Sequence, residues 1–319
     1  MTGASGLLGR TTAETLRARG DEVTVLQRRP AGLPGPEVLG DIADSDVVRR
    51  VAAGQDAVLH LAAKVDVVGR WSDYVRANIE GTRTVVQACL SEGVSRLVNV
   101  SSPSVAHAGN ALAGAAAGRA DPDGARGHYA RSKAVAEQLA LAADSTDLRV
   151  LAVRPHLVWG PGDTQLVARL VDRARAGRLP ILGSGAALID TTYVDNAAAA
   201  LVAAVDAPAN GEALVVSNGE PRPVEEILRR VCRAAGVPGP QLRLPAWLAR
   251  AAGTVVDGAW AAMRRQDDPP ITRFLAEQLT TAHWFDQRRT RERLHWAPDV
   301  SLDEGFDRLA KWYAQGPTT

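Results

Sequence analysis

The sequence predicts an α/β fold of the doubly wound kind, in which helices cover both faces of a parallel sheet. Two observations predict it: short apolar runs alternate with helical stretches through the first half of the chain, and a glycine-rich turn stands at its start. Strand–helix alternation of this kind produces parallel strands joined by crossover helices. Beyond about Pro180 the alternation loosens, which indicates a smaller second domain interleaved with the first.

Hydrophobic periodicity places the individual elements. Short apolar runs predict buried strands at residues 23–26, 57–61, 97–100 and 150–153. Apolar residues at helical spacing predict helices at residues 11–19, 46–53, 73–92 and 129–143. Residues 106–126 are rich in glycine and alanine and contain a turn signal, so we expect a mobile loop there. In the C-terminal part, residues 213–217 form the clearest strand.

The stretch MTGASGLLGR places Gly3, Gly6 and Gly9 three residues apart. Such a turn lets the backbone approach a pyrophosphate and directs the anion to a helix N-terminus, although an ordinary tight turn is the alternative. In a doubly wound nucleotide-binding sheet this turn follows the first, central strand, but only Met1 and Thr2 precede it here. We therefore expect that the first strand is missing from this sequence and is encoded upstream of Met1.

The end of the second strand indicates which dinucleotide is bound. NAD sites usually carry an acidic residue there for the ribose 2′-hydroxyl, whereas this chain has Gln27 followed by Arg28 and Arg29. Because arginine holds phosphate in a bidentate manner, the pattern favours NADP(H). Two solvated surface arginines are the alternative explanation, with NAD(H) as the alternative cofactor.

Ser102, Tyr129 and Lys133 form the candidate catalytic group. Tyr129 and Lys133 stand four residues apart, so a helix places both side chains on one face. We expect the ammonium group to lower the phenol pKa, which would let Tyr129 exchange a proton with a carbonyl or alcohol oxygen. Ser102, at the end of a predicted strand, can hydrogen-bond the same oxygen. For an isolated Tyr-x-x-x-Lys pattern, a surface pair is the alternative.

Composition and charge exclude several function classes. With 37 basic and 36 acidic residues, the chain lacks the basic surplus of a nucleic-acid-binding protein. Its two cysteines, Cys89 and Cys232, and its scattered histidines show no metal-ligand spacing, so we expect no metal. We find no signal peptide and no segment apolar enough to span a membrane, and a reducing cytoplasm is the expected location.

Several motifs occur together in one order: TGASGLLG, GDIAD, HLAA, ANIEGT, NVSSPSV, YARSK and VRPHLVWGPGD. In order and spacing they resemble the extended short-chain dehydrogenase/reductase family over essentially the whole chain. The later segment PPITRFLAEQLTTAHWFD resembles its 3β-hydroxysteroid dehydrogenase branch. The resemblance implies a Rossmann NADP(H)-binding domain at residues 1–180 and a mostly substrate-binding domain at residues 181–319, part of which returns to the sheet.

The resemblance also implies roles for individual residues. Tyr129 would be the acid or base, Lys133 would hold the nicotinamide ribose and tune Tyr129, and Ser102 would polarise the substrate oxygen. Arg154 would face the nicotinamide from a strand end. The implied cofactor-binding set, with Asn78 as a supporting residue, is Gly3, Ser5, Gly6, Leu7, Leu8, Arg28, Arg29, Asp41, Ile42, Leu61, Ala62, Ala63, Asn78, Tyr129, Lys133, Pro155 and Leu157.

Within this branch the chain resembles bacterial β-keto acid reductases that serve long-chain olefin biosynthesis, through runs such as RPHLVWGPGD and RARAGRLPILGSG. The implied substrate, a β-keto acid with two long alkyl chains, needs a long apolar pocket. Lys64 is a candidate to meet its carboxylate, and Trp71 and Trp159 are candidate pocket walls, although each could be an ordinary surface or core residue. An apolar stripe over residues 244–259 predicts an amphipathic helix. We interpret it as core packing, with an acyl-chain wall or a membrane-touching surface as the alternatives.

Three other functions are alternatives for a chain with this fold. A 3β-hydroxysteroid or sterol-4-carboxylate dehydrogenase would catalyse the oxidation and prefer NAD, which Gln27 and the two arginines after it disfavour. A nucleotide-sugar epimerase would need a more polar second domain, and a non-catalytic NADP(H)-sensing protein typically lacks the catalytic tyrosine or lysine.

The expected partners are a lipid-like keto acid and the dinucleotide, with no nucleic acid. A homodimer through residues 73–92 and 129–143 is implied by the resemblance, as is association with other olefin-pathway enzymes. The apolar stripe adds a peripheral membrane contact to these expectations.

Overall fold

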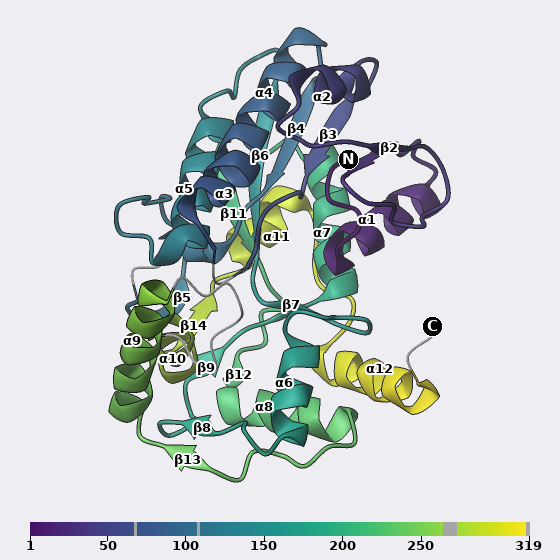
Figure 1. Cartoon of the computed structure of the whole chain (residues 1–319). Coiled ribbons are helices and arrows are strands. Elements are labelled where there is room, and N and C mark those ends of the chain that lie inside the picture. Colours follow the sequence, from purple (N-terminus) through teal and green to yellow (C-terminus); the bar gives the residue numbers. More distant parts are fainter. Residues whose placement is uncertain (67–68, 107–108, 264–272, 317–319) are drawn as a thin grey trace.

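The computed structural model describes residues 1–66, 69–106, 109–263 and 273–316 of the chain. A central parallel sheet with helices on both faces lies beside a group of shorter strands and helices (Figure 1). The predicted doubly wound α/β fold is therefore confirmed. The division into two domains at residue 180 stays a prediction. β11 (Glu212–Val216) lies beyond that point and pairs with the central sheet, in line with the expectation that part of the second domain returns to it.

Residues 1–3 lie in the middle of the central sheet. The parallel strands run in the spatial order β2 (Glu37–Leu39), β1 (Val25–Gln27), residues 1–3, β3 (Ala57–His60), β4 (Arg96–Val100), β6 (Arg149–Pro155) and β11. Thr2 forms parallel bridges with Leu26 on one side and His60 on the other. The Leu26 amide donates to the Met1 carbonyl at 2.8 Å, and the Thr2 amide donates to the Leu59 carbonyl at 2.9 Å. The position of the expected first strand is therefore occupied by this short bridge alone.

Two helical layers cover the sheet (Figure 1). One face carries α2 (Ser45–Ala52), α4 (Gly81–Ser91) and α5 (Gly127–Leu141), and the other carries α1 (Leu7–Arg19), α7 (Val194–Asp206) and α11 (Arg288–Leu294). Successive side chains of β4 point to opposite faces of the sheet and so contact both helical layers. Val98 and Val100 pack in the cluster that holds α1 and α7, and Leu97 packs with α2 and α4. A strand with buried residues on both faces is expected in a doubly covered parallel sheet.

The predicted helix at residues 73–92 is interrupted by a π-helical segment. It consists of α3 (Trp71–Tyr74), the π-helical segment Val75–Glu80 and then α4. π-helical insertions are rare and are frequent at functional sites. This one contains Asn78, which is buried next to the candidate site.

The C-terminal part adds short strands and five further helices within the described residues. One sheet has the order β12 (Arg222–Pro223), β9 (Leu188–Ile189), β14 (His283–Phe285) and β5 (Leu112–Ala115). Two strand pairs are β7 (Val158–Trp159) with β10 (Thr192–Tyr193), and β8 (Ile181–Leu182) with β13 (Arg243–Leu244). The helices are α6 (Val167–Arg175), α8 (Val224–Ala234), α9 (Ala246–Ala262), α10 (Arg273–Thr280) and α12 (Leu302–Gln315).

The segment 106–126, predicted as a mobile loop, contains strand β5. β5 pairs in parallel with β14, which lies more than 160 residues further along the chain. The prediction was wrong because glycine and alanine weaken local strand signals, whereas the partner strand that stabilises β5 is remote in sequence. Residues 107–108 of this segment lie outside the described residues.

The apolar stripe at residues 244–259 does not pack into the core as interpreted. Trp247 is 71% exposed and Val255 is 72% exposed on α9, while Leu244 and Leu248 line the main cavity. The helix therefore presents apolar side chains both to the cavity and to the outside. Within the described residues, no helix combines the length and the apolar character needed to cross a membrane.

Candidate active site

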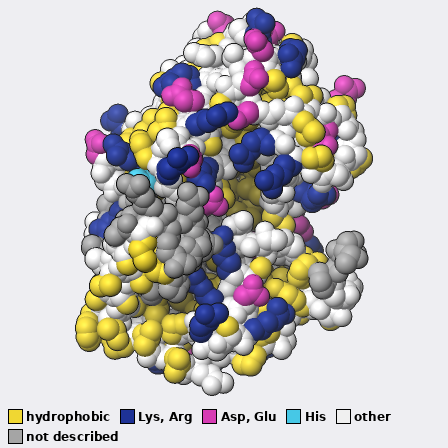
Figure 2. All heavy atoms as spheres, in the orientation of Figure 1, with side chains coloured by type: hydrophobic (Ala, Val, Ile, Leu, Met, Phe, Trp, Pro, Cys, Tyr) yellow, Lys and Arg dark blue, Asp and Glu magenta, His cyan; other side chains and the backbone are white. Residues whose placement is uncertain are grey.

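A large cavity lies between the C-terminal edge of the central sheet and the C-terminal helices. Its volume is about 1530 Å³, and its lining runs from the glycine turn past Ser102 and Tyr129 to α9. Figure 2 shows the hollow between the two parts of the molecule, with apolar side chains inside it and Lys or Arg side chains around it. Pockets for a single ligand usually measure about 300 to 1,000 Å³, so this cavity has room for a dinucleotide and a second molecule.

The glycine turn fits a pyrophosphate. Gly3 has φ +78°, and a Cβ atom there would lie 2.7 Å from the Ala62 amide nitrogen. A Cβ atom on Gly9 would collide with the Gly3 carbonyl. At Gly6, by contrast, the nearest protein atom would be 3.9 Å away, so space remains beside the backbone where the turn lines the cavity. α1 begins there with no side-chain cap and no acidic residue in its first turn, which leaves its N-terminus suited to an anion.

At the end of β1, Gln27 and Arg28 line the cavity. Gln27 is buried and donates to the Glu37 carboxylate, so the two side chains are held together. Arg28 lines the cavity with its side chain exposed, whereas Arg29 is exposed and is not among the described lining residues. Of the two arginines only Arg28 lines the cavity, and its contact with the cofactor stays a prediction.

The rest of the implied cofactor set mostly lines the cavity. Asp41 does so while it pairs with Arg76 at 2.9 Å. The other members that line it are Gly3, Ser5, Gly6, Leu7, Leu8, Ile42, Leu61, Ala62, Ala63, Tyr129, Lys133, Pro155 and Leu157. With Arg28 included, the structure thus gathers residues from six separate stretches of the chain along one continuous surface.

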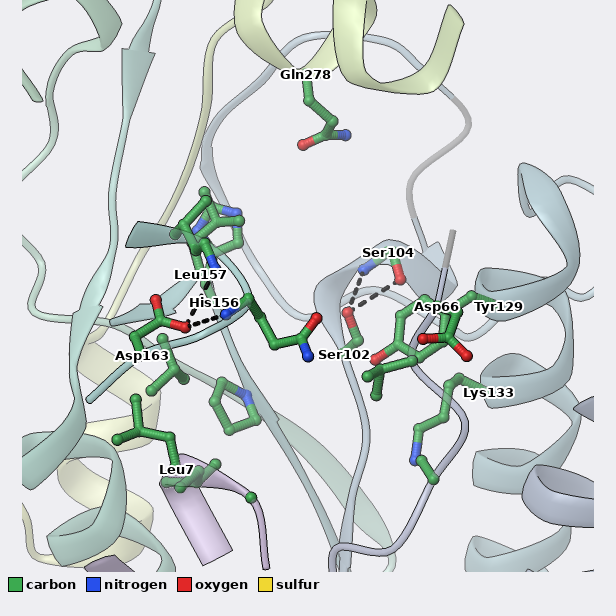
Figure 3. A pocket seen from close by; sticks show the side chains of 18 of the residues that line it. Leu7, Asp66, Ser102, Ser104, Tyr129, Lys133, His156, Leu157, Asp163 and Gln278 are labelled. Carbon is green, nitrogen blue, oxygen red and sulfur yellow. Dashed lines mark hydrogen bonds between the residues drawn. The ribbon is translucent and has the colours of Figure 1, made fainter. Parts of the chain in front are cut away.

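Ser102, Tyr129 and Lys133 lie together on one side of the cavity (Figure 3). Ser102 follows the end of β4, and its Oγ lies 2.9 Å from Ser104 Oγ. Tyr129 and Lys133 are on α5, one turn apart. The Lys133 ammonium is buried and donates to the Val100 carbonyl at 2.6 Å, and burial lowers its pKa to about 8.

The pKa of the Tyr129 phenol is raised, which contradicts the expected lowering by Lys133. Burial is the main cause, and a hydrogen bond with Ser102 offsets part of the rise. The expectation considered only the neighbouring charge, whereas desolvation of the phenolate dominates here and the ammonium donates to a backbone carbonyl. The protonated phenol is therefore the favoured form at neutral pH.

Asn78 does not line the cavity but holds its wall in place. Its side-chain oxygen accepts from the Lys64 amide at 2.7 Å, and its amide donates to the Lys64 carbonyl and to Ser132 Oγ on α5. Asn78 thereby links the segment after β3 to the helix that carries Tyr129. Its direct contact with the cofactor, implied by the resemblance, has no support in this geometry.

The residues proposed to contact the substrate differ in whether they line the cavity. Lys64 lines the cavity, but its ammonium pairs with Asp66 at 2.6 Å and lies 5.3 Å from the centre of the Tyr74 ring. Trp71 is not among the described lining residues and packs against His128.

Trp159 also lies outside the lining of the cavity, so its interpretation as a pocket wall was wrong. The indole is buried and stacks on Phe306 of α12, with a ring distance of 4.6 Å, and its Nε1–H donates to Thr191. A side chain on a short strand such as β7 can point toward the cavity or away from it. For Trp159, the contact with α12 holds the indole on the side away from the cavity. Arg154 likewise turns away from the cavity and pairs with the buried Glu137 of α5.

Two groups of lining residues were missed by the sequence analysis. The first is apolar and comes mainly from α6, α8 and α10; it comprises Leu166, Leu170, Leu179, Leu182, Ile189, Val224, Ile227, Leu228 and Leu279. Leu244 and Leu248 line the cavity as well, and both belong to the apolar stripe already named in the sequence. Helical spacing of the leucines in α6 and α8 was the available signal. The second group is His156 and His283, which lie beside one another with ring centres 5.1 Å apart. No cluster that could hold a metal ion occurs among the residues described.

Comparison with known proteins agrees with this geometry. Residues 1–217 match the model of the NAD dependent epimerase/dehydratase family. A 2-alkyl-3-oxoalkanoate reductase of Stenotrophomonas maltophilia is 40% identical, with 97% of each chain covered. A sterol-4-alpha-carboxylate 3-dehydrogenase, decarboxylating, of Mus musculus is 28% identical over 97% of this chain and 89% of its own. Among solved structures, MoeE5 in complex with UDP-glucuronic acid and NAD is similar, with TM-score 0.73, 26% identity and 98% of each chain covered.

Proposed function

The chain belongs to the NAD dependent epimerase/dehydratase family, and we propose that this NAD(P)-dependent oxidoreductase reduces the 3-keto group of a 2-alkyl-3-oxoalkanoic acid with NADPH. The product is the 3-hydroxy acid. The observation that carries the proposal is the 40% identity with a 2-alkyl-3-oxoalkanoate reductase over nearly the full length of both chains. The cavity supports it, because an apolar surface from α6, α8, α9 and α10 continues from the candidate catalytic residues and suits alkyl chains.

Ser102, Tyr129 and Lys133 provide the acid chemistry of the reduction. The nicotinamide cofactor, when bound, supplies the hydride that adds to the C3 carbon. As the C=O electron pair moves to oxygen, the Tyr129 hydroxyl gives that oxygen its proton, and Ser102 donates a second hydrogen bond to it. The Lys133 ammonium stabilises the phenolate that Tyr129 becomes. The glycine turn and the α1 N-terminus would hold the pyrophosphate, with Pro155 and Leu157 against the nicotinamide.

The raised pKa of Tyr129 is compatible with its role as the proton donor in the reduction. A phenol kept protonated by burial is ready to donate, whereas oxidation of an alcohol would need the phenolate as a base.

The rate of reduction should fall as pH rises through about 8. Burial lowers the pKa of Lys133 to about 8, so the ammonium is present below that pH and is lost above it. With it goes the charge that stabilises the Tyr129 phenolate. The measurement is the pH profile of kcat/KM from neutral to alkaline pH. In Lys133→Met the activity should be low, and the fall of kcat/KM at alkaline pH should be absent. If that variant kept the same alkaline fall, the titration would belong to another group.

Arg28→Ala should weaken NADPH binding about tenfold or more while NADH binding changes little. One charge-assisted contact with the 2′-phosphate is worth about 1.5 to 3 kcal/mol, which corresponds to about 10- to 100-fold in affinity. Arg29→Ala is the matched control, since Arg29 is the adjacent arginine and does not line the cavity. Titration of both nucleotides into both variants measures the effect. Equal losses in the two variants would point to general surface charge.

The proposed reaction is tested by a panel of 2-alkyl-3-keto acids and steroid alcohols, each assayed with both cofactors. We expect reduction of the keto acids with preference for NADPH. Efficient oxidation of a 3β-hydroxysteroid or sterol-4-carboxylate with NAD, without keto acid reduction, would replace the proposal with the dehydrogenase function.

The proposal also includes a membrane contact, a dimer, a cellular location and partner enzymes. The exposed Trp247 and Val255 on α9 support a peripheral membrane contact near the apolar end of the cavity. α4 and α5 lie side by side on one face of the sheet, which supports the isologous dimer through these helices (Figure 1). A cytoplasmic location and association with other enzymes of olefin biosynthesis complete the proposal.

A further inference from the structure

We propose that His156, oriented by Asp190, is the residue that binds the carboxylate of the substrate. The inference rests on the proposed function, which places the ketone of a 3-oxo acid at Ser102 and Tyr129. That function leaves open what recognises the acid group, although a carboxylate inside a largely apolar cavity needs a charged or hydrogen-bonding partner.

The His156 ring is held in a fixed orientation by a buried carboxylate. His156 Nδ1 lies 2.5 Å from Asp190 Oδ1, and Asp190 is fully buried. The other carboxylate oxygen of Asp190 accepts from Ser217 Oγ at 2.7 Å and from the Phe285 amide at 3.0 Å. Because both Asp190 oxygens are engaged, neither the carboxylate nor the ring can turn without the loss of a buried hydrogen bond.

The other ring nitrogen is available to a ligand. His156 lines the cavity, and within the described residues its Nε2 has no hydrogen-bond partner. A carboxylate that binds at Nε2 would lie on the side of the ring opposite Asp190. A hydrogen bond from Nε2–H to such a ligand is charge-assisted, because the acceptor is an anion. A histidine held by a buried acid at the wall of a cavity is thus built for an anionic group.

His156 also lies where the acid group of a 3-oxo acid must lie. It follows the last residue of β6, and Ser102 follows the end of the neighbouring strand β4 at the same edge of the sheet. Adjacent strands are about 4.8 Å apart. In the substrate, the carboxyl carbon is only two bonds from the keto carbon, so its binding group must stand next to the ketone donors. Figure 3 shows His156 and Ser102 facing the same cavity from two sides.

Lys64 and Arg154 are less suited to this role. Lys64 lines the cavity but its ammonium is paired with Asp66, so a substrate carboxylate would have to compete with that ion pair. Arg154, one strand position before Pro155, points to Glu137 and does not line the cavity. The apolar walls of the cavity near α9 would meanwhile receive the alkyl chains, which leaves His156 for the acid group.

The test compares substrates with and without the negative charge. Since 3-oxo acids lose carbon dioxide, the stable probes are a 2-alkyl-3-hydroxyalkanoic acid and its methyl ester, oxidised with NADP⁺. The wild-type protein should prefer the acid. His156→Gln should lower kcat/KM for the acid about 10- to 100-fold, mainly through KM, and leave the ester nearly unchanged, as expected for one charge-assisted hydrogen bond. NADP⁺ binding, measured by titration, should stay the same.

A second variant separates recognition from structural support. Asp190→Asn keeps the shape of the side chain and should produce the same acid-selective loss, to a smaller extent. Equal losses for acid and ester in both variants would show a structural role and overturn the inference. So would an acid-selective loss in Lys64→Met but not in His156→Gln. If the wild-type protein oxidises neither probe, the proposed function itself fails, which is a different result from an ester oxidised as well as the acid.

Discussion

Tyr129→Phe should lower kcat for ketone reduction about 10²- to 10⁴-fold while NADPH binding stays nearly unchanged. General acid catalysis by a positioned side chain contributes a factor of this size, and phenylalanine removes only the hydroxyl that supplies the proton. Tyr129 is on α5 and its ring lines the cavity, so the ring contacts persist in the variant. The measurement pairs steady-state reduction rates with a direct titration of NADPH, so that chemistry and cofactor binding are read separately.

Tyr313→Phe is the matched control for this variant. Tyr313 is half-buried on α12 and is not among the described residues that line the cavity. The same atom is removed there, and activity should remain close to that of the wild type. Comparable turnover in Tyr129→Phe and Tyr313→Phe would overturn the assignment of Tyr129 as the proton donor.

Local spacing made the cofactor side of the site predictable. The glycine turn, the Gln-Arg-Arg run and the Tyr-x-x-x-Lys pair are each contiguous, so their chemistry follows from a few neighbouring residues. The fold follows from the same kind of information, since apolar runs and helical periods alternate along the chain. Those features reach the cavity in the structure, Arg29 being the exception in its run.

Side-chain direction and remote pairing were not predictable in the same way. Arg154 and Trp159 are the sequence neighbours of residues that line the cavity, yet neither lines it. Trp159 packs on Phe306 and Arg154 pairs with Glu137, and neither partner is a sequence neighbour. Strand β5 depends on β14 for its pairing, and the sign of the pKa shift of Tyr129 depends on how much of the protein covers it. Each of these outcomes is decided by tertiary packing, which a single stretch of sequence does not contain.

Arg154→Met should lower the free energy of unfolding by about 3 to 5 kcal/mol and lower activity as well. The side chains of Arg154 and Glu137 are 0% and 1% exposed and form a bidentate ion pair. Arg154 Nε and Nη2 donate to the two Glu137 carboxylate oxygens, at 2.7 Å and 2.5 Å. Removal of one partner leaves an uncompensated buried charge, which costs about 3 to 5 kcal/mol. Activity should follow, because Glu137 is on α5 one turn after Lys133, and the same arginine also donates to the backbone at Gly118. Denaturant unfolding and steady-state kinetics measure the two effects.

The double variant Arg154→Met with Glu137→Gln distinguishes an unpaired charge from lost packing. If the stranded Glu137 carboxylate causes most of the damage, its neutralisation should restore a large part of the stability even though the ion pair is gone. Arg83→Met gives the scale for an exposed pair: Arg83 and Glu80 are each 46% exposed, and the cost should stay below about 1 kcal/mol. A double variant as unstable as Arg154→Met alone would mean that the arginine acts through its packing and its backbone contacts. In that case the pair would contribute to the site by filling the space beneath α5 and not by its charge.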